Sequence, residues 1–239
     1  MNEKKIDHRH NYYIVLDTET ANTSGTNGGV NASSALVYDL GFAVIDSKGR
    51  IYDRFSFINS DVFFKMSEVM KSAYYADKIP LYLKGIESGE YEVKNWYEIR
   101  SILNQMCKEY EPNAIIAHNA YFDYKSATAT QRYLTKSKYR FFFPFDIPIW
   151  DSLKMARATI GKSKGYKEFC EENSFLTKHK NPRPRLTAEI LYKYLTNDID
   201  YKEEHTGLAD VMIEKEIFLK CLEMATLKNL PKELFGERK

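Results

Sequence analysis

Cysteine is scarce in this sequence, neither sign of charge is in excess, and no long apolar run occurs; each absence excludes a class of protein. The three cysteines, Cys107, Cys170 and Cys221, lie far apart and form no C-x-x-C pair. Neither a disulfide framework nor a zinc knuckle is therefore indicated. No segment approaches the roughly 18 apolar residues of a membrane span, and residues 1–11 lack the apolar core of a signal peptide. We expect a cytoplasmic protein without a membrane anchor.

The formal net charge of +2 says little about partners. An enzyme that gathers carboxylates around metal ions can be near neutral overall and still carry basic patches. The chain of 239 residues, 44% of them hydrophobic, is long enough for one sizeable core. We expect a single α/β domain at 12–226, preceded by a polar leader at 1–11 and followed by a short tail at 227–239.

Three strand-like segments come first in the chain. Apolar and β-branched residues fill 12–18, 36–46 and 51–58, and a short "SKGR" turn separates the last two. Consecutive strands joined by such a turn pair antiparallel, which predicts a three-stranded meander. A helix is predicted over 93–110, because apolar residues recur there at intervals of three and four. Its predicted buried residues are Trp96, Ile99, Leu103, Met106 and Tyr110.

The second half of the chain alternates strands and helices. The apolar run 114–117 leads into a helix, and a further strand is predicted at 147–151. A strand, a helical crossover and another strand form a parallel pair. The order predicts an α/β fold with a mixed sheet, three antiparallel and two parallel strands, flanked by helices. In the predicted final helix, 208–224, the residues expected to be buried are Leu208, Val211, Met212, Phe218, Leu219 and Leu222.

Two acids follow the first apolar strand, in the stretch "YIVLDTET". Side chains in a strand alternate faces, so Asp17 and Glu19 point the same way. Two adjacent carboxylates repel each other unless a cation lies between them, and oxygen ligands of this kind suit Mg²⁺ or Mn²⁺. Taken alone, a D-x-E at the end of a strand is also typical of a solvated turn.

A second acid motif follows the buried run 114–117, in the stretch "AHNAYFD". Asp123 is expected in the first turn of the next helix, at the carboxyl end of a strand, where ligands of α/β sheets usually bind. Asp17 and Asp123 would then share a crevice. The alternative is local: Asn119 caps the helix and Asp123 complements its dipole.

The third motif is "EEHTGLAD", at the start of the final helix. His205 precedes that helix and Asp210 lies in its first turn, with Thr206 and Gly207 as candidate cap residues. Alone, this pattern is also typical of helix capping. In combination, the three motifs supply four carboxylates and one histidine from three separate elements.

Together the motifs resemble those of the DEDD exonuclease superfamily, specifically its histidine-containing, DnaQ-like branch, which includes proofreading exonucleases, RNase T and oligoribonuclease. The family's D-x-E matches 17–19, a motif resembling H-N-x-x-F-D matches 118–123, and H-x4-D matches 205–210. The tyrosine branch would need a tyrosine where this chain has Thr206. The resemblance covers about 12–224 and implies a ribonuclease-H-like fold.

The resemblance also implies a reaction: 3′-to-5′ hydrolysis of phosphodiester bonds with two Mg²⁺ ions, for which Mn²⁺ can substitute, releasing nucleoside 5′-monophosphates. Asp17 would bridge both ions, Glu19 and Asp210 would complete the first site, and Asp123 would support the second. Two such ions stabilise the attacking and leaving oxygens. His205 would be the general base, a role that suits the ordinary histidine pKa of about 6.5.

By the same resemblance, Thr18, Thr20, Asn119 and Phe122 are candidate substrate-binding residues at the terminal nucleotide. Phe122 would stack on a base, although core packing is an equal alternative. His118 is expected to be structural.

Three further features stay open at the level of sequence. Asp151 matches an acidic family position, but an N-cap role is favoured. The cationic stretch 178–185 either follows a phosphate backbone or is a solvated loop. The polar segment at about 21–34, longer than in relatives, either shapes access to the 3′ end or is a surface insertion.

The favoured function is a 3′-to-5′ exonuclease on single-stranded DNA, in replication or repair. An exoribonuclease of the RNase T or oligoribonuclease type is the alternative, because short motifs do not record how the 2′-hydroxyl is recognised. A catalytically inactive nucleic-acid-binding protein is a third hypothesis, and the complete set of acids argues against it. The chain is expected to be free-standing, and a DNA polymerase contact is left open.

Overall fold

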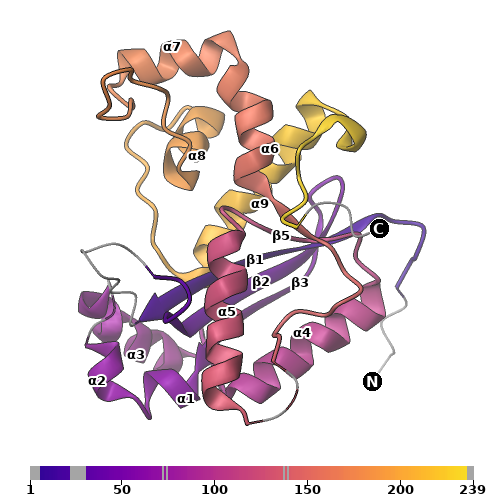
Figure 1. The fold of residues 1–239 in the computed structure, drawn as a ribbon, viewed down its shortest axis with the longest axis vertical. Coiled ribbons are helices and arrows are strands. Elements are labelled where there is room, and N and C mark those ends of the chain that lie inside the picture. The colour runs from indigo at the N-terminus through magenta and orange to yellow at the C-terminus, as the bar shows by residue number, and fades with distance from the viewer. Residues whose placement is uncertain are drawn as a thin grey trace.

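A six-stranded mixed sheet forms the centre of the computed structural model, which describes residues 6–21, 31–71, 73, 75–136, 138 and 140–235. The strand order is β4-β3-β2-β1-β5-β6 (Figure 1). The strands are β1 Tyr12–Ala21, β2 Leu36–Asp46, β3 Ile51–Asn59, β4 Glu92–Lys94, β5 Ile115–Ala117 and β6 Ile149–Asp151. β1, β2 and β3 pair antiparallel, whereas β4, β5 and β6 run parallel to β3, β1 and β5. The predicted fold class is confirmed, with one additional edge strand.

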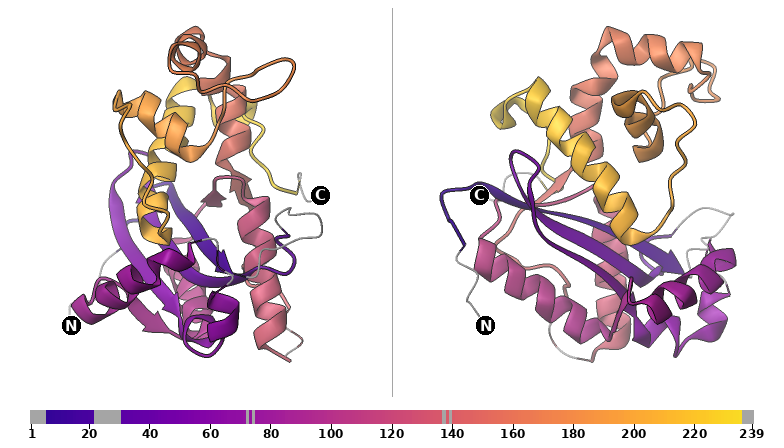
Figure 2. Two further views of the ribbon diagram at one scale, coloured as in Figure 1. Left: turned by 90° about the vertical axis from the view of Figure 1, so that its left-hand side faces the viewer. Right: turned by 180° about the vertical axis from the view of Figure 1, so that it is seen from behind.

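Helices cover both faces of this sheet. They are α1 Ser60–Phe63, α2 Ser67–Met70, α3 Ile79–Ser88, α4 Trp96–Tyr110, α5 Tyr121–Leu134, α6 Ser152–Ala158, α7 Lys164–Glu172, α8 Ala188–Thr196 and α9 Gly207–Met224. α4 and α5 lie on one face, and α9 lies on the other with α6, α7 and α8 beyond it (Figures 1 and 2). α1, α2 and α3 gather at the end toward which β1 points (Figure 1). No helix in the described ranges is long and apolar enough to cross a membrane.

The alternation of side chains along β1 divides the core into two layers. Ile14 and Leu16 are fully buried in the cluster that contains the apolar face of α4. Tyr13 and Val15 are buried in the cluster that contains α9. Because side chains alternate along a strand, the odd-numbered residues that follow on β1 face the α9 side.

That alternation decides where the acids of β1 point. Asp17 and Glu19 share the face of Tyr13 and Val15 and so project toward α9. Thr18 has the opposite direction, toward α5, and its hydroxyl reaches a side chain on that helix. Consecutive residues of β1 therefore face two different helices, α9 and α5.

Several predicted boundaries are wrong. β1 continues to Ala21, so its acids lie within the strand and not after its end. The helix predicted from Val93 begins at Trp96, because Asn95 and Glu98 form a capping box, and Val93 belongs to β4. All five residues predicted to be buried in α4 are buried. Neither β4 nor α1–α3 is among the predicted elements.

The predicted buried stripe of the last helix is only partly right. Val211 and Phe218 are buried as expected, whereas the four other predicted residues are only partly covered. α9 contacts β1 and β2 on one side and α6 and α8 on the other. This double contact widens its buried face beyond a single stripe and adds Gly207, Asp210, Ile213, Glu214, Ile217 and Cys221.

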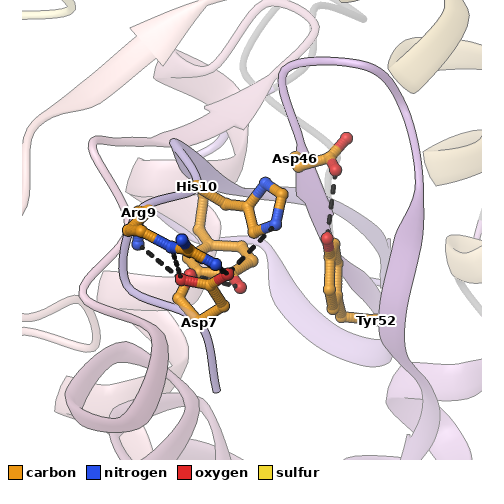
Figure 3. A network of polar contacts seen from close by, with 6 residues as sticks. Asp7, Arg9, His10, Asp46 and Tyr52 are labelled. Carbon is orange, nitrogen blue, oxygen red and sulfur yellow. Dashed lines mark hydrogen bonds and ion pairs between the residues drawn. The ribbon is translucent and has the colours of Figure 1, made fainter.

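The described ends of the chain pack beside the strands, far along β1 from its acids. At the start of β1, the Asp7 carboxylate accepts hydrogen bonds from the Arg9 side chain at 2.6 and 2.8 Å, with His10 beside it, and the Tyr52 hydroxyl donates to Asp46 at 3.1 Å (Figure 3). At the other terminus, residues 230–235 run beside β6.

The predicted loop at about 21–34 falls largely on residues 22–30, which lie outside the described ranges.

β2 and α9 meet backbone to backbone at two glycines. A Cβ added to Gly41 would lie 2.2 Å from the backbone nitrogen of Leu208, and one added to Gly207 would lie 2.5 Å from the backbone nitrogen of Gly41. No real Cβ tolerates such distances, so only glycine fits either position. Gly41 is also the direct partner of Asp17 in the β1–β2 register. The first turn of α9 is thereby held beside the acids of β1.

A buried carboxylate completes this junction. Asp39, with no exposed surface, accepts hydrogen bonds at 2.8 Å from the backbone N–H of Gly207 and from the hydroxyl of Tyr82. Thr206 is the N-cap residue of α9 but makes no capping hydrogen bond through its side chain. Asp39 therefore supplies from β2 the acceptor that a helix N-terminus requires.

Replacing Gly41 with alanine should force β2 and α9 apart. We expect a decrease of about 1–3 kcal/mol in the free energy of unfolding, the usual cost of overpacking. Gly165→Ala on α7 is the matched control, because its Cβ would meet only the Tyr194 hydroxyl at 3.1 Å. Urea unfolding measures both variants, and equal stability of Gly41→Ala and the wild type would contradict the close approach of β2 and α9.

Candidate active site

One strand and two helices bring the predicted acids to one cleft. Asp17 and Glu19 of β1 and Asp123 of α5 line it together with His205 and Asp210 from the start of α9. Its volume is about 1590 Å³. The three sequence motifs, separated by as many as 193 positions from Asp17 to Asp210, are thus one site. The prediction that Asp17 and Asp123 share a crevice is confirmed.

Asp123 is fixed by a contact from the neighbouring strand. It is 3% exposed, and its Oδ1 accepts a hydrogen bond of 2.8 Å from the hydroxyl of Thr18. The Thr18 hydroxyl also lies 3.4 Å from that of Ser126 on the same helix. Thr18 is itself buried, so its clearest role here is to orient the carboxylate of Asp123.

The turn between β5 and α5 corrects one interpretation from the sequence. Asn119 is not the N-cap of α5: that residue is Ala120, and α5 has no side-chain cap. Asn119 instead has a left-handed backbone with φ of 66°, a conformation that asparagine tolerates better than most residues. Its N–H donates to Asp151 at 3.2 Å. Asp151 also accepts from the N–H of Leu153 at 2.9 Å, so its predicted N-cap role on α6 is confirmed.

His118 is tied to the protein through both ring nitrogens. Nε2 lies 2.9 Å from the carbonyl oxygen of Leu186, and Nδ1 lies 3.0 Å from the hydroxyl of Ser152. A carbonyl can only accept, so Nε2 carries the proton and Nδ1 accepts from the hydroxyl. Burial lowers the pKa of His118, which favours this neutral form. The prediction that His118 is structural agrees with these contacts.

His205 stands at the rim of the acids in an unusual backbone conformation. Its φ is 51°, in the left-handed region. The ring stacks on that of Tyr75 with centroids 4.5 Å apart and planes at 16°. Ligand atoms of Glu19, His205 and Asp210 all lie within 4.8 Å of one another. Burial, followed by the charge of Lys78, lowers the pKa of His205, so its imidazole is neutral at pH 7.

Burial and mutual repulsion raise the pKa of every acid in the cleft. Burial raises the pKa of Asp123 to about 7. Burial, then the charges of Glu203 and Asp39, raise that of Asp210 to about 8. Asp17 and Glu19 have their pKa values raised well above the ordinary range by burial first and by the neighbouring carboxylates second. Without cations, the acids hold protons that they would not hold in water.

The residues present fit divalent cations. An oxygen atom of Asp210 and one of Glu214 are buried and have no hydrogen-bond partner. A cluster of carboxylate oxygens with no thiolate is the donor set that Mg²⁺ and Mn²⁺ prefer. Cations between these side chains would satisfy the unpaired oxygens and replace the protons. Asp17, Glu19, Asp123 and Asp210 are the residues that would hold them.

A wall of basic side chains also lines the cleft. It includes the cationic stretch predicted at 178–185, which folds back on itself: the N–H of Thr177 donates to the carbonyl of Arg183 at 2.9 Å, and that of Arg185 to the carbonyl of Phe175 at 3.0 Å. The basic residues on the wall are Arg157, Lys167, His179, Lys180, Arg183 and Arg185. The sequence left this loop unassigned, and the fold places it in the same cleft as the acids.

The predicted substrate-binding residues divide into two groups. Thr18, Asn119 and Phe122 line the cleft, and Phe122 is partly exposed, which leaves its ring accessible. Thr20 is buried and is not among the lining residues. Glu214, absent from the predicted set, also lines the cleft. The sequence could have indicated Glu214 only through its spacing: it follows Asp210 by four residues, which places both side chains on one face of α9.

No protein-family model and no curated protein sequence matches the chain. Solved structures do match. A full-length 3′-exonuclease aligns with a TM-score of 0.55 and 12% identity over 90% of this chain and 82% of that one. The nuclease domain of 3′hExo, a DEDDh family member bound to rAMP, aligns with a TM-score of 0.54 and 14% identity over 91% and 94%.

A third match is the zinc-bound E. coli ExoI–ssDNA complex, with a TM-score of 0.53 and 14% identity; it covers 92% of this chain but 41% of that one. Identities this low establish the fold and nothing finer. The chain has the ribonuclease-H-like fold of DEDDh 3′-exonucleases, as the sequence predicted.

The metal-free protein should lose stability as the pH rises from about 5 to about 9. A carboxyl whose folded pKa is raised stabilises the fold below its unfolded pKa, near 4, and this contribution is lost as pH rises through the folded pKa. For Asp123 and Asp210 those folded values are about 7 and 8. The unfolding temperature in EDTA should therefore fall across this window, and Mg²⁺ should raise it most at the alkaline end.

Asp210→Asn is the matched control for this titration, because it removes one titrating carboxyl and keeps its shape. Its unfolding temperature in EDTA should fall less steeply with pH than that of the wild type. An unfolding temperature that rises with pH in EDTA, or identical slopes for the two proteins, would contradict the raised pKa values.

Proposed function

We propose that the chain is a 3′-to-5′ exonuclease that hydrolyses the terminal phosphodiester bond of single-stranded nucleic acid with two divalent cations, Mg²⁺ in the first place and Mn²⁺ as a substitute. The observation that supports this most is the meeting of Asp17, Glu19, Asp123, His205 and Asp210 in one cleft. If these acids had only structural roles, the burial of each carboxylate would need its own explanation. None of these acids forms an ion pair in the described part of the chain that would explain its burial.

The proposed roles follow from position. Asp17 is repelled by each of the other acids, so it lies among them and would contact both cations. Glu19 and Asp210 would hold the first, and Asp123, oriented by Thr18, the second. Bound there, the cations would offset the negative charge that develops on the attacking and leaving oxygens. The product would be a nucleoside 5′-monophosphate.

His205 is the proposed general base. Its imidazole is neutral at pH 7 and lies against the carboxylates of Glu19 and Asp210. It would take a proton from the attacking water, and its partial exposure leaves room to pass the proton on to solvent. Stacking on Tyr75 fixes the plane of the ring.

The basic wall supports a single-stranded polymer as substrate. Lysine and arginine side chains opposite a metal site can follow a phosphate backbone and hold it across the cleft. Phe122, partly exposed among the acids, is placed to stack on a base. Stacking and phosphate contacts of this kind need an unpaired strand.

We favour DNA over RNA as substrate, with an exoribonuclease as the alternative. Among the structural neighbours, ExoI was solved with ssDNA, whereas 3′hExo was solved with rAMP and a related 3′-exonuclease on a histone mRNA stem-loop. These neighbours support both DNA and RNA as substrate classes. Three buried, free cysteines support a reducing, cytoplasmic setting.

Digestion of 5′-labelled single-stranded DNA, single-stranded RNA and duplex DNA with Mg²⁺ tests the proposal. Asp17→Asn should abolish hydrolysis of every substrate, because the central carboxylate is removed, and should unfold no earlier than the wild type, because a buried repulsion disappears with it. Shortened products should retain the 5′ label, with nucleoside 5′-monophosphates released. Hydrolysis by Asp17→Asn at the wild-type rate would overturn the assignment, and faster digestion of RNA would favour the alternative.

His205→Ala should lower kcat by about 10²–10⁴-fold, the usual contribution of a general base, with little change in the Mg²⁺ concentration that gives half-maximal rate. Because the pKa of His205 is lowered, the wild-type rate at saturating Mg²⁺ should already level off near pH 6.5, and the variant should lack this inflection. A large rise in the required Mg²⁺ with unchanged kcat would instead make His205 a metal ligand.

The double variant Lys180→Gln, Arg183→Gln should raise KM on long single strands and leave a dinucleotide unaffected. The slope of log kcat/KM against log salt should become shallower by about 0.7 for each phosphate that the variant no longer neutralises. Lys108→Gln, on the exposed side of α4 and outside the cleft, is the control. An equal effect on the dinucleotide would show that the loop acts on the reaction centre and not on the polymer.

A further inference from the structure

Glu214 is a fifth acid in the cleft, outside the set that the sequence motifs define. It lies on α9 one turn after Asp210, and its side chain lines the same cavity. It is 3% exposed. The backbone N–H of His118 donates to its carboxylate, but Oε2 has no hydrogen-bond partner.

Glu214 interacts most strongly with the two acids of the second proposed metal site, Asp17 and Asp123. Among the neighbouring charges that repel Asp17, Glu214 has the largest effect, ahead of Asp123 and Asp210. For Glu214 itself the largest repulsion comes from Asp123. Glu214 is therefore a close electrostatic neighbour of Asp17 and Asp123, the two acids proposed for the second metal site, as well as of Asp210 on its own helix.

A carboxylate in such a position needs a positive partner. An unpaired buried charge is strongly destabilising, and a buried polar atom without a hydrogen bond adds to that cost. A proton on Oε2 would itself need an acceptor, and none is present for that atom. A leucine of similar size would fill the same space on α9 without either cost. A cation shared with neighbouring carboxylates satisfies both the charge and the free oxygen.

We propose that Glu214 is a ligand of the second divalent cation, which it holds together with Asp17 and Asp123. This inference rests on the proposed function, since it adds a residue to the same metal site. The second site then has three carboxylates from three elements, β1, α5 and α9. More carboxylate ligands mean tighter binding of a hard cation, so the second ion should stay bound without substrate.

Glu214→Gln keeps the size of the side chain and removes its charge. Calorimetric titration of the EDTA-treated, full-length protein with Mn²⁺ should give two sites for the wild type. In the variant one of them should weaken by about 10–100-fold, as expected when a ligand is removed. The metal-free variant should unfold at a higher temperature than the wild type because a repulsion is removed, and it should be stabilised less by Mn²⁺.

Glu216→Gln is the matched control, because Glu216 is on the same helix, is half-exposed and pairs with Lys215 away from the cleft. Its Mn²⁺ titration should equal that of the wild type. Glu214→Asp provides a second, charge-preserving variant: it draws the carboxylate back by one methylene and should weaken the same site by a smaller factor. It serves in place of Glu214→Gln if that variant does not fold.

Two wild-type Mn²⁺ affinities in Glu214→Gln, or in Glu214→Asp, would overturn the inference and leave Glu214 with a packing role. This outcome is distinct from failure of the proposed function. If the wild type binds two ions and digests nucleic acid while the variants bind equally well, only the role of Glu214 is refuted. If the wild type neither binds Mn²⁺ nor hydrolyses any substrate, both proposals fall.

Discussion

The site depends on one close contact, the approach of the α9 backbone to β2 at Gly207 and Gly41. A side chain at either position would force the helix away from the strand. Asp39 then binds the N-terminus of α9 through the N–H of Gly207. With the helix seated in this way, Asp210 lies beside the acids of β1. The geometry of the acid cleft is therefore fixed by a contact that contains none of the proposed metal-binding acids.

This contact has to hold against the charges that it brings together. Every acid in the cleft has a raised pKa, mainly because it is buried, and each neighbour adds repulsion. The fold offsets that cost with two apolar layers, one on each face of the sheet. Such an arrangement favours cation binding, because cations relieve the repulsion and displace protons. The balance between apolar packing and buried like charge therefore decides how stable the acid cleft is without cations.

What the sequence could predict was local or periodic. The central strands, the buried face of α4 and the three acid motifs follow from the alternation of side chains and from short spacings. The roles of Asp39 and Gly41 could not be predicted in this way, because each depends on a partner more than 160 positions away. The start of α4 was missed although its capping box was present in the sequence. The basic loop could be seen in the sequence, but only the fold could place it in the cleft with the acids.

The elements that the sequence did not predict are also part of the site. His205 has a left-handed backbone, which costs a non-glycine residue about 1–2 kcal/mol. Two contacts from the segment between α2 and α3 offset this cost: Tyr75 stacks on the imidazole ring, and the Lys78 ammonium donates to the carbonyl of Glu204 while lying 4.4 Å from the Tyr75 ring centroid. The same ammonium lowers the pKa of His205, after burial. Tyr75 and Lys78 therefore help to orient the ring of the proposed base, and Lys78 adds to the effect of burial in favouring its neutral form.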